Sequence, residues 1–160
     1  MINLTAIVPF YNEEKTLKQS VERLLNENIF FEIILSDDNS SDYSSEIAKE
    51  LSYKYENIKY IHSNKNLGKG NAISNALSIL NTSHVVIHDA DLEYFPKDIV
   101  QMYEKALTNQ NSLILGSRFK GNKQRNNVYL RTYLANRFMS IFFSLINLYW
   151  VSDVATCYKL

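Results

Sequence analysis

Short apolar runs alternate with longer amphipathic runs between Leu4 and Gly116, and this alternation limits the possible folds more than any other feature of the sequence. The short runs have the length of strands, are rich in β-branched or aromatic residues and are bounded by polar loops: Leu4–Pro9, Phe31–Leu35, Ile58–His62, Ser83–His88 and Ser112–Gly116. Such alternation is typical of parallel strands joined by crossover helices. We therefore predict an α/β fold in which a mostly parallel sheet is flanked by helices.

The amphipathic runs predict the crossover helices. Their apolar residues repeat at helical spacing, in the sets Leu17, Val21, Leu24 and Leu25, then Tyr43, Ile47 and Leu51, then Ile73, Ala76, Leu77 and Leu80. Pro96 stands where a further helix through Ala106 begins, a position that tolerates the missing amide hydrogen of proline. The 160 residues fit one ordinary domain, and no repeat or linker divides them.

Composition excludes several classes of protein. Lysine plus arginine and aspartate plus glutamate number 17 each, so the net charge gives no sign of a nucleic-acid partner. Cys157 is the only cysteine and has no intrachain partner for a disulfide, and the first residues lack the features of a secretory signal. No stretch reaches the roughly 18 to 20 apolar residues of a membrane helix. We expect a cytoplasmic protein without a membrane span.

Polar loops follow the predicted strands, at residues 11–14, 37–42, 66–70 and 89–93. In open parallel sheets, ligands bind outside the carboxyl ends of the strands, so these loops are the candidate site.

Asp89 and Asp91 follow the fourth strand, and residues two apart in an extended segment point to the same side. Both carboxylates can face one Mg²⁺ or Mn²⁺ ion, which would offset charge on a departing diphosphate. Glu93 reaches the same region at the next alternate position.

Asp37 and Asp38 follow the second strand, where many nucleotide-binding sheets place an acid for ribose or base contacts. The acids in this loop also suit helix capping, with Ser41 or Asp42 accepting from the amides that open the next helix. Nucleotide contact and helix capping both stay open, for different residues of the loop 37–42.

Pro9, Tyr11 and Glu13 close the first strand. An aromatic ring and a carboxylate at this place can flank a nucleotide base, although a turn followed by the start of a helix explains the same residues.

The loop Gly68-Lys69-Gly70 resembles a phosphate loop without matching one. The Walker pattern is absent, and Ile73 occupies the position of the third glycine in the dinucleotide fingerprint. Kinase-like and dehydrogenase-like functions therefore lose support. Lys69 is interpreted as a solvated side chain.

The stretch from Lys105 to Ser152 contains no acidic residue, so it can approach an anionic ligand or a lipid headgroup. Within it, Arg118 follows the fifth predicted strand and either contacts phosphates or lies on the surface. Residues 128–151 form a predicted helix with one broad apolar face: Leu130, Leu134, Phe138, Ile141, Phe142, Leu145 and Tyr149. This face either packs on the core or on a part of the protein beyond this sequence, or it lies at a membrane interface near an anionic lipid.

Five motifs in this order resemble glycosyltransferase family 2, and most closely its dolichyl-phosphate mannose synthases and bacterial polyprenyl-phosphate glycosyltransferases. They are Val8–Glu14, Asp37–Asp42, Asn66–Gly70, Asp89–Tyr94 and Gly116–Phe119. The resemblance implies a Rossmann-like GT-A fold that transfers a sugar, with inversion, from a UDP- or GDP-linked donor. The implied acceptor is a polyprenyl or dolichyl phosphate, which would place the protein at the inner face of the membrane.

The resemblance also assigns roles to residues. It implies Mg²⁺ or Mn²⁺ on Asp91 and Glu93, although glutamine replaces Glu93 in some relatives. Catalytic roles fall on Asp91 and on Asp153 at the acceptor side. Contacts with the nucleotide sugar are implied for Pro9, Tyr11, Glu13, Leu35, Asp37, Asp89, Ala90 and Arg118.

The last eight residues, from Asp153 to Leu160, resemble the start of the acceptor-side segment of the family, and we expect the full protein to continue beyond them. We predict a nucleotide-sugar-binding core in residues 1–125, joined within the same domain by an amphipathic helix and the start of the acceptor side in residues 126–160.

The alternative function is a nucleotide-sugar-binding module without turnover. A nucleotidyltransferase is disfavoured, because the loop after the first strand is acidic and lacks glycine.

Overall fold

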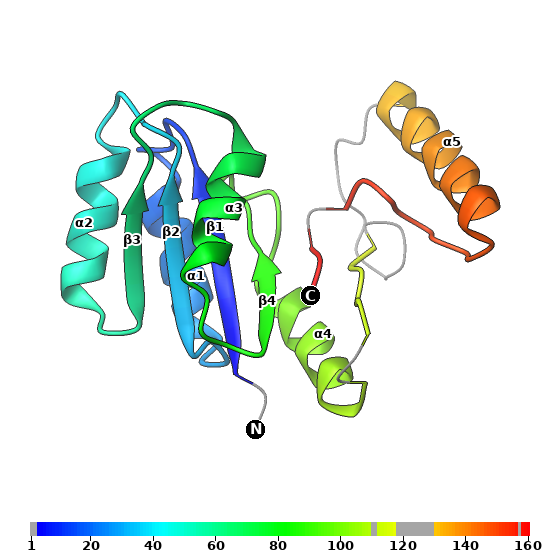
Figure 1. The fold of residues 1–160 in the computed structure, drawn as a ribbon, viewed down its shortest axis with the longest axis horizontal. Coiled ribbons are helices and arrows are strands. Elements are labelled where there is room, and N and C mark those ends of the chain that lie inside the picture. Colours follow the sequence, from blue (N-terminus) through cyan, green and yellow to red (C-terminus); the bar gives the residue numbers. More distant parts are fainter. Residues whose placement is uncertain (1–2, 110–111, 118–129, 157) are drawn as a thin grey trace.

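A four-stranded parallel sheet forms the centre of the computed structural model, which describes residues 3–109, 112–117, 130–156 and 158–160 (Figure 1). The strands lie in the order β3-β2-β1-β4, and every neighbouring pair is parallel. Their bounds are β1 (Leu4–Phe10), β2 (Glu32–Asp37), β3 (Ile58–His62) and β4 (His84–Ile87). The helices are α1 (Leu17–Asn26), α2 (Ser44–Lys54), α3 (Lys69–Ser78), α4 (Lys97–Thr108) and α5 (Leu130–Asn147).

Apolar side chains cover both faces of the sheet, as expected for strands joined by crossover helices. Alternate residues of β1, such as Leu4 and Val8, share one core with α1, α2 and α4. Ile7 and Ile34 point to the opposite face and pack against Ala76 of α3. Figure 1 shows α1 and α3 on opposite sides of the sheet. The predicted α/β fold is therefore confirmed.

The strand register brings the polar loops to one edge of the sheet. Phe10 at the end of β1 lies opposite Asp37 at the end of β2. β4 ends at Ile87, opposite Ile7, while β1 continues to Phe10. The chain after β4 therefore runs on beside the last residues of β1, and the amide of His88 donates to the carbonyl oxygen of Ile7 at 2.9 Å.

The prediction of a fifth sheet strand at Ser112–Gly116 is wrong. Leu115 forms an isolated antiparallel bridge with Lys159 instead. The amide of Ile114 donates to the carbonyl of Leu160 at 2.7 Å, and the amide of Leu160 donates back at 3.0 Å. An apolar run of strand length needs backbone partners, and this run finds them in the end of the chain.

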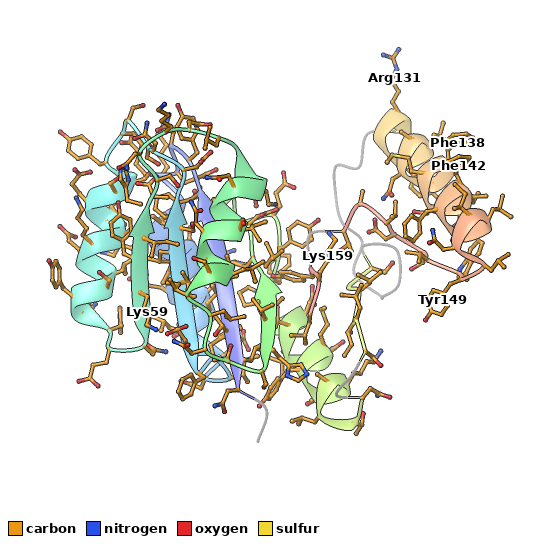
Figure 2. The ribbon with its side chains drawn as sticks, in the orientation of Figure 1. Lys59, Arg131, Phe138, Phe142, Tyr149 and Lys159 are labelled. Atoms are coloured by element: carbon orange, nitrogen blue, oxygen red, sulfur yellow. The ribbon has the colours of Figure 1, made fainter. Side chains whose placement is uncertain are left out.

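α5 buries a polar stripe rather than an apolar one. Asn136, Ser140 and Ser144, which are four residues apart, are buried, and each bonds to the segment that follows the helix. Figure 2 shows Phe138 and Phe142, which are 72% and 58% exposed, projecting from the other side of the helix.

The predicted apolar face of this helix is therefore exposed and does not pack on the core. Leu134, Ile141, Leu145 and Tyr149 are all exposed, and the side chain of Leu130 lies outside the description. Among the described residues, no helix combines the length and the apolar character needed to cross a bilayer.

Candidate functional site

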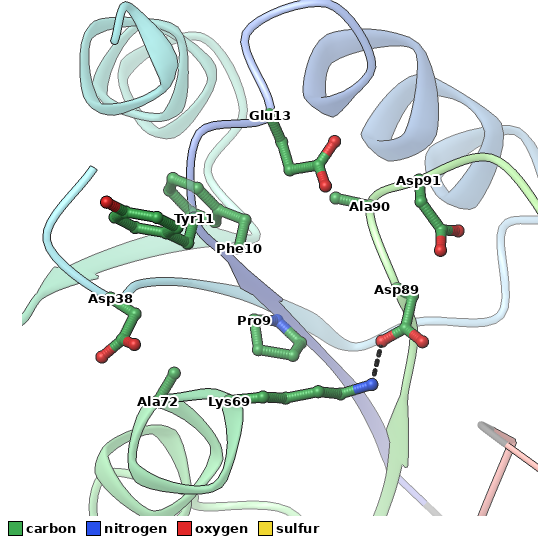
Figure 3. A pocket seen from close by; sticks show the side chains of 10 residues that line it. All are labelled: Pro9, Phe10, Tyr11, Glu13, Asp38, Lys69, Ala72, Asp89, Ala90 and Asp91. Carbon is green, nitrogen blue, oxygen red and sulfur yellow. Dashed lines mark hydrogen bonds and ion pairs between the residues drawn. The ribbon is translucent and has the colours of Figure 1, made fainter. Parts of the chain in front are cut away.

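A pocket of about 290 Å³ opens at the edge of the sheet where the polar loops meet (Figure 3). It is bounded by the end of β1, the loop after β2, the start of α3 and the turn after β4. Ten residues line it: Pro9, Phe10, Tyr11, Glu13, Asp38, Lys69, Ala72, Asp89, Ala90 and Asp91. Six of the predicted site residues are among them, namely Pro9, Tyr11, Glu13, Asp89, Ala90 and Asp91.

Hydrogen bonds join the loop after β1 to the loop after β2. The amide of Asn12 donates to Ser40 Oγ at 3.0 Å, and the amide of Ser41 donates to Asn12 Oδ1 at 2.8 Å. The amide of Glu13 donates to Ser44 Oγ at 2.7 Å. These contacts fix the turn that places Tyr11 and Glu13 at the pocket, where Tyr11 is 47% exposed.

Asp42 caps the start of α2, as the capping interpretation predicts. Its carboxylate accepts from the amide of Ser44 at 3.0 Å and from the amide of Glu14 at 3.2 Å. Burial raises the pKa of Asp42, but these hydrogen bonds outweigh burial and hold the pKa below its usual value.

Asp37 is wholly buried and does not line the pocket, so the structure does not bring its carboxylate to the predicted nucleoside contact. The carboxylate accepts from Ser45 Oγ, from the amide of Ser40 at 2.8 Å and from the hydroxyl of Tyr60 at 3.2 Å. His62 Nδ1 lies 3.1 Å away. Burial raises the pKa of Asp37, but the hydrogen bonds from Ser45, Ser40 and His62 outweigh it, so the pKa is lowered.

Asp38 lines the pocket in place of its neighbour. Its carboxylate accepts from the amides of Leu67 and Gly68 at 3.1 and 2.6 Å, which ties the loop before α3 to the loop after β2. Successive residues leaving a strand point to opposite sides, so only one of the two acids can face the pocket. The sequence pattern offered both acids for a nucleotide contact and the resemblance assigned it to Asp37, because neither shows which of the two turns inward.

Asp89 and Asp91 lie in a turn after β4, not in the strand itself as the alternation argument assumed. Leu92 has a left-handed backbone with φ of 66°, and the amide of Glu93 donates to Asp91 Oδ1 at 3.0 Å. The turn thus holds the Asp91 carboxylate in place. The side chain of Glu93 is exposed and is not among the lining residues.

Lys69 is the residue that the sequence pattern missed most clearly. It is not simply solvated: its ammonium group forms an ion pair with Asp89 Oδ1 inside the pocket. α3 begins at Lys69, and Gly68 before it has φ of 90°, a conformation that favours glycine. The glycine therefore serves the turn that aims Lys69 at Asp89.

The donor groups of the pocket suit a hard cation. Glu13, Asp38, Asp89 and Asp91 supply carboxylates, and Mg²⁺ or Mn²⁺ prefers oxygen ligands. The described residues contain no cluster of three or more His, Cys, Asp or Glu side chains that could hold a metal. A cation here would therefore complete its shell with phosphate oxygens and water.

His88 ties this turn to two distant parts of the chain. Its Nε2 lies 3.0 Å from Ser20 Oγ on α1, and its Nδ1 lies 3.0 Å from the hydroxyl of Tyr158. Burial lowers the pKa of His88 to about 4, so the ring is neutral at pH 7. His62 lies beside Asp37 and His84 beside Ser83, so all three histidines contact other side chains of the fold.

Besides Asp37 and Glu93, two further predicted site residues, Leu35 and Asp153, do not line the pocket. Leu35 is buried in the core of the sheet. Asp153 is buried, and its Oδ1 accepts from Asn136 Nδ2 at 2.7 Å. Arg118 lies outside the described residues.

Comparisons with known proteins point to one family. The model of the family described as Glycosyl transferase family 2 matches residues 5–158. The dolichol-phosphate mannosyltransferase of Pyrococcus furiosus is 32% identical over 84% of this chain, and the UDP-N-acetylglucosamine–dolichyl-phosphate N-acetylglucosaminyltransferase of Methanococcus voltae is 30% identical over 92%. The chain spans 38% and 64% of the lengths of these two relatives.

Solved structures share the fold. Glucosyl-3-phosphoglycerate synthase from Mycobacterium tuberculosis, in complex with Mn²⁺, UDP and phosphoglyceric acid, matches 99% of this chain and 55% of its own, with a TM-score of 0.73 and 16% identity. The mannosyltransferase PcManGT from Pyrobaculum calidifontis, in complex with GDP-Man and Mn²⁺, matches 72% of this chain and 35% of its own, with a TM-score of 0.64 and 19% identity. These likenesses show the predicted GT-A fold.

Proposed function

The chain belongs to glycosyltransferase family 2, and we propose that it binds a UDP- or GDP-linked sugar and transfers the sugar to an acceptor with inversion. One observation carries the proposal. A single pocket holds an exposed aromatic ring and a carboxylate toward one end, Tyr11 and Asp38, and the pair Asp89 and Asp91 toward the other (Figure 3). This arrangement suits a ligand with a flat base at one end and a diphosphate at the other.

In the proposed complex the nucleoside lies against Pro9 and Tyr11, with Asp38 as the acceptor of its hydrogen bonds. Glu13 is a further lining residue and is also proposed to contact the nucleoside. Asp37 supports this end indirectly, because its buried network holds the loop that carries Asp38. The choice between uracil and guanine rests on pocket shape, and relatives with both kinds of nucleotide share the fold.

Asp91 would hold a Mg²⁺ or Mn²⁺ ion, with Glu93 as a further ligand if its exposed side chain turns inward. When bound, the ion offsets the charge that builds up on the diphosphate leaving group. Asp89 and Ala90 would contact the sugar diphosphate, and Arg118 is proposed as a further phosphate contact. Complexes of two structural neighbours contain Mn²⁺.

The proposed acceptor is a polyprenyl or dolichyl phosphate. An acceptor phosphate oxygen forms a bond to the anomeric carbon while the bond from that carbon to the diphosphate oxygen breaks, and attack from the opposite face inverts the centre. A phosphate is already anionic and needs little help from a general base. The names of the two relatives concern dolichyl-phosphate acceptors, and Asp153 is proposed to belong to the acceptor side.

α5 is proposed to lie on the membrane surface that contains such an acceptor. The exposed side chains of Phe138, Phe142 and Leu145 would enter the boundary between headgroups and acyl chains, while Arg131 and Arg137 contact anionic headgroups. Peripheral contact at the cytoplasmic face of the membrane is the location that fits this proposal.

Calorimetric titration with UDP-glucose and GDP-mannose, each with and without Mn²⁺, tests donor binding. We expect one of the two to bind in the presence of Mn²⁺ and the affinity to fall at least tenfold in Asp91→Ala, as for loss of one charged contact. Glu104→Ala, an exposed acid on α4, is the matched control. Binding that needs no metal and is undiminished in Asp91→Ala would rule out the role of Asp91.

The alternative function is a nucleotide-sugar-binding module without turnover. Release of UDP or GDP on addition of a polyprenyl phosphate separates the two functions. Donor binding without any release, in a chain extended to the full length of its relatives, would favour the module.

A further inference from the structure

Lys69 reaches across the pocket from the first turn of α3 to the carboxylate of Asp89 (Figure 3). It is the one cation among the ten lining residues, four of which carry carboxylates. The lining of the pocket is therefore strongly acidic, and the ammonium group of Lys69 offsets the charge of one of the two acids that face the expected diphosphate.

The ion pair between Lys69 and Asp89 is exposed and can break when a ligand binds. The side chain of Lys69 is 52% exposed and that of Asp89 is 21% exposed, and ion pairs near solvent contribute little to stability because water screens them. The lysine side chain is a flexible stem with a point charge at its end, so its ammonium group can change partners without moving α3. The start of a helix also favours a phosphate nearby, since its amides and dipole attract negative charge.

We propose that Lys69 is a phosphate-binding residue of the donor site that exchanges Asp89 for the diphosphate when the nucleotide binds. Before a ligand binds, Lys69 pairs with Asp89 and weakens the attraction of the two acids, Asp89 and Asp91, for a divalent cation. When the metal and nucleotide arrive together, the ammonium group turns to a phosphate oxygen and Asp89 becomes free for the ligand. The inference rests on the proposed function, because it assumes a nucleoside diphosphate in this pocket.

The exchange predicts two effects of opposite sign for the loss of the Lys69 charge. Mn²⁺ alone should bind more tightly, since a competing cation is gone. A nucleoside diphosphate with Mn²⁺ should bind more weakly, since a phosphate contact is gone. A lysine that only stabilises the fold would change both affinities in the same direction or neither.

Lys69→Met tests the exchange in the intact chain. Binding of Mn²⁺ alone is followed by the electron paramagnetic resonance of the free ion, and binding of UDP or GDP with saturating Mn²⁺ is followed by calorimetry. We expect Mn²⁺ alone to bind roughly two- to fivefold more tightly, the range for one exposed ion pair. The nucleotide should bind roughly ten- to a hundredfold more weakly, the range for one hydrogen bond to a charged group.

Two matched variants complete the design. Lys65→Met removes the same charge from an exposed position in the preceding loop and should leave both affinities unchanged. Lys69→Arg keeps the charge and should retain most of the nucleotide affinity. Circular dichroism and thermal unfolding of each variant check that the fold is intact, which the exposed position of Lys69 favours.

The outcomes are distinguishable. Nucleotide affinity in Lys69→Met within twofold of the wild type overturns the phosphate contact, and a fall in both affinities overturns the exchange. A wild-type chain that binds neither UDP nor GDP contradicts the proposed function instead.

Discussion

Nδ1 of His88 lies 3.0 Å from the hydroxyl of Tyr158, and this buried hydrogen bond joins the turn that carries Asp89 to the end of the chain, 70 residues later. The two rings also stack, with centroids 5.7 Å apart. Tyr158 packs against Tyr94 as well, at 4.9 Å between ring centroids. Tyr158 thus connects the turn that carries Asp89 and Asp91 to the last residues that the structure describes.

Tyr158→Phe should destabilise the fold by about 1 to 3 kcal/mol, because it keeps the ring but leaves a buried nitrogen of His88 without this partner. Urea unfolding at pH 7 measures the change. Tyr53→Phe, at a residue that is 90% exposed on α2, is the control and should leave stability unchanged. Equal stability of Tyr158→Phe and the wild type would mean that the hydrogen bond contributes nothing net.

The lowered pKa of His88, about 4 against an ordinary 6.5, predicts a pH dependence of stability. In the unfolded chain the His88 ring takes up a proton as the pH falls below 6.5, whereas in the folded chain it does so only at about pH 4. The contribution of the neutral ring is therefore complete above pH 6.5 and is lost as the pH falls toward 4. The free energy of unfolding should drop by about 2 kcal/mol from this group between pH 7 and pH 5.

His88→Gln tests the assignment, because glutamine does not titrate in this range. Urea unfolding at pH 7 and pH 5 should show a flatter pH dependence in the variant than in the wild type. An identical slope in both proteins would assign the pH dependence to other groups.

Asp37 and Asp38 are neighbours with different roles, and substitution should separate them. Asp38→Asn should weaken nucleotide binding roughly tenfold, because its carboxylate lines the pocket. It should also destabilise the fold by about 1 to 3 kcal/mol, because this buried carboxylate accepts from the amides of Leu67 and Gly68. Asp37→Asn should destabilise the fold by a similar amount, because it disturbs a buried carboxylate held by Ser45, Ser40 and Tyr60, but it does not remove a lining residue of the pocket. Calorimetry and urea unfolding measure the two effects, and a tenfold loss of affinity in Asp37→Asn but not in Asp38→Asn would exchange the roles.

The fold was predictable from the sequence because hydrophobic periodicity reports burial directly. Four of the strands and the helices between them lie close to their predicted places, and the strand ends shift by at most two residues. The run at Ser112–Gly116 was wrongly predicted as a fifth strand of the sheet, because an apolar run of strand length does not show which segment it pairs with. Its partner, Tyr158–Leu160, is too short to show a pattern of its own.

The site was predictable as a set of loops but not in detail. The register of parallel strands brings the ends of β1, β2 and β4 together, so their polar loops had to meet. Which acid turns inward at residues 37–38, and whether Lys69 points to solvent or to Asp89, depends on turn geometry that no periodicity encodes. α5 shows the same limit, since it buries its serines against the following segment and leaves its apolar side exposed.

The exposed side of α5 predicts binding to lipid vesicles. The wild-type chain should sediment with vesicles that contain anionic lipid, because Phe138 and Phe142 can enter the interface while Arg131 contacts the headgroups. Phe142→Asp should weaken this binding at least tenfold, since it replaces about 2 kcal/mol of apolar burial with a charge. Phe142 is 58% exposed, so this substitution should not unfold the chain.

Tyr53→Asp is the matched control, because it places the same charge at a more exposed aromatic residue on α2, away from α5. It should bind vesicles like the wild type. Arg131→Gln should weaken binding to anionic vesicles about fivefold. On neutral vesicles, Arg131→Gln and the wild type should bind equally. Vesicle binding that is equal in Phe142→Asp and the wild type would exclude α5 as the membrane contact, and the exposed phenylalanines would then need a protein surface to cover them.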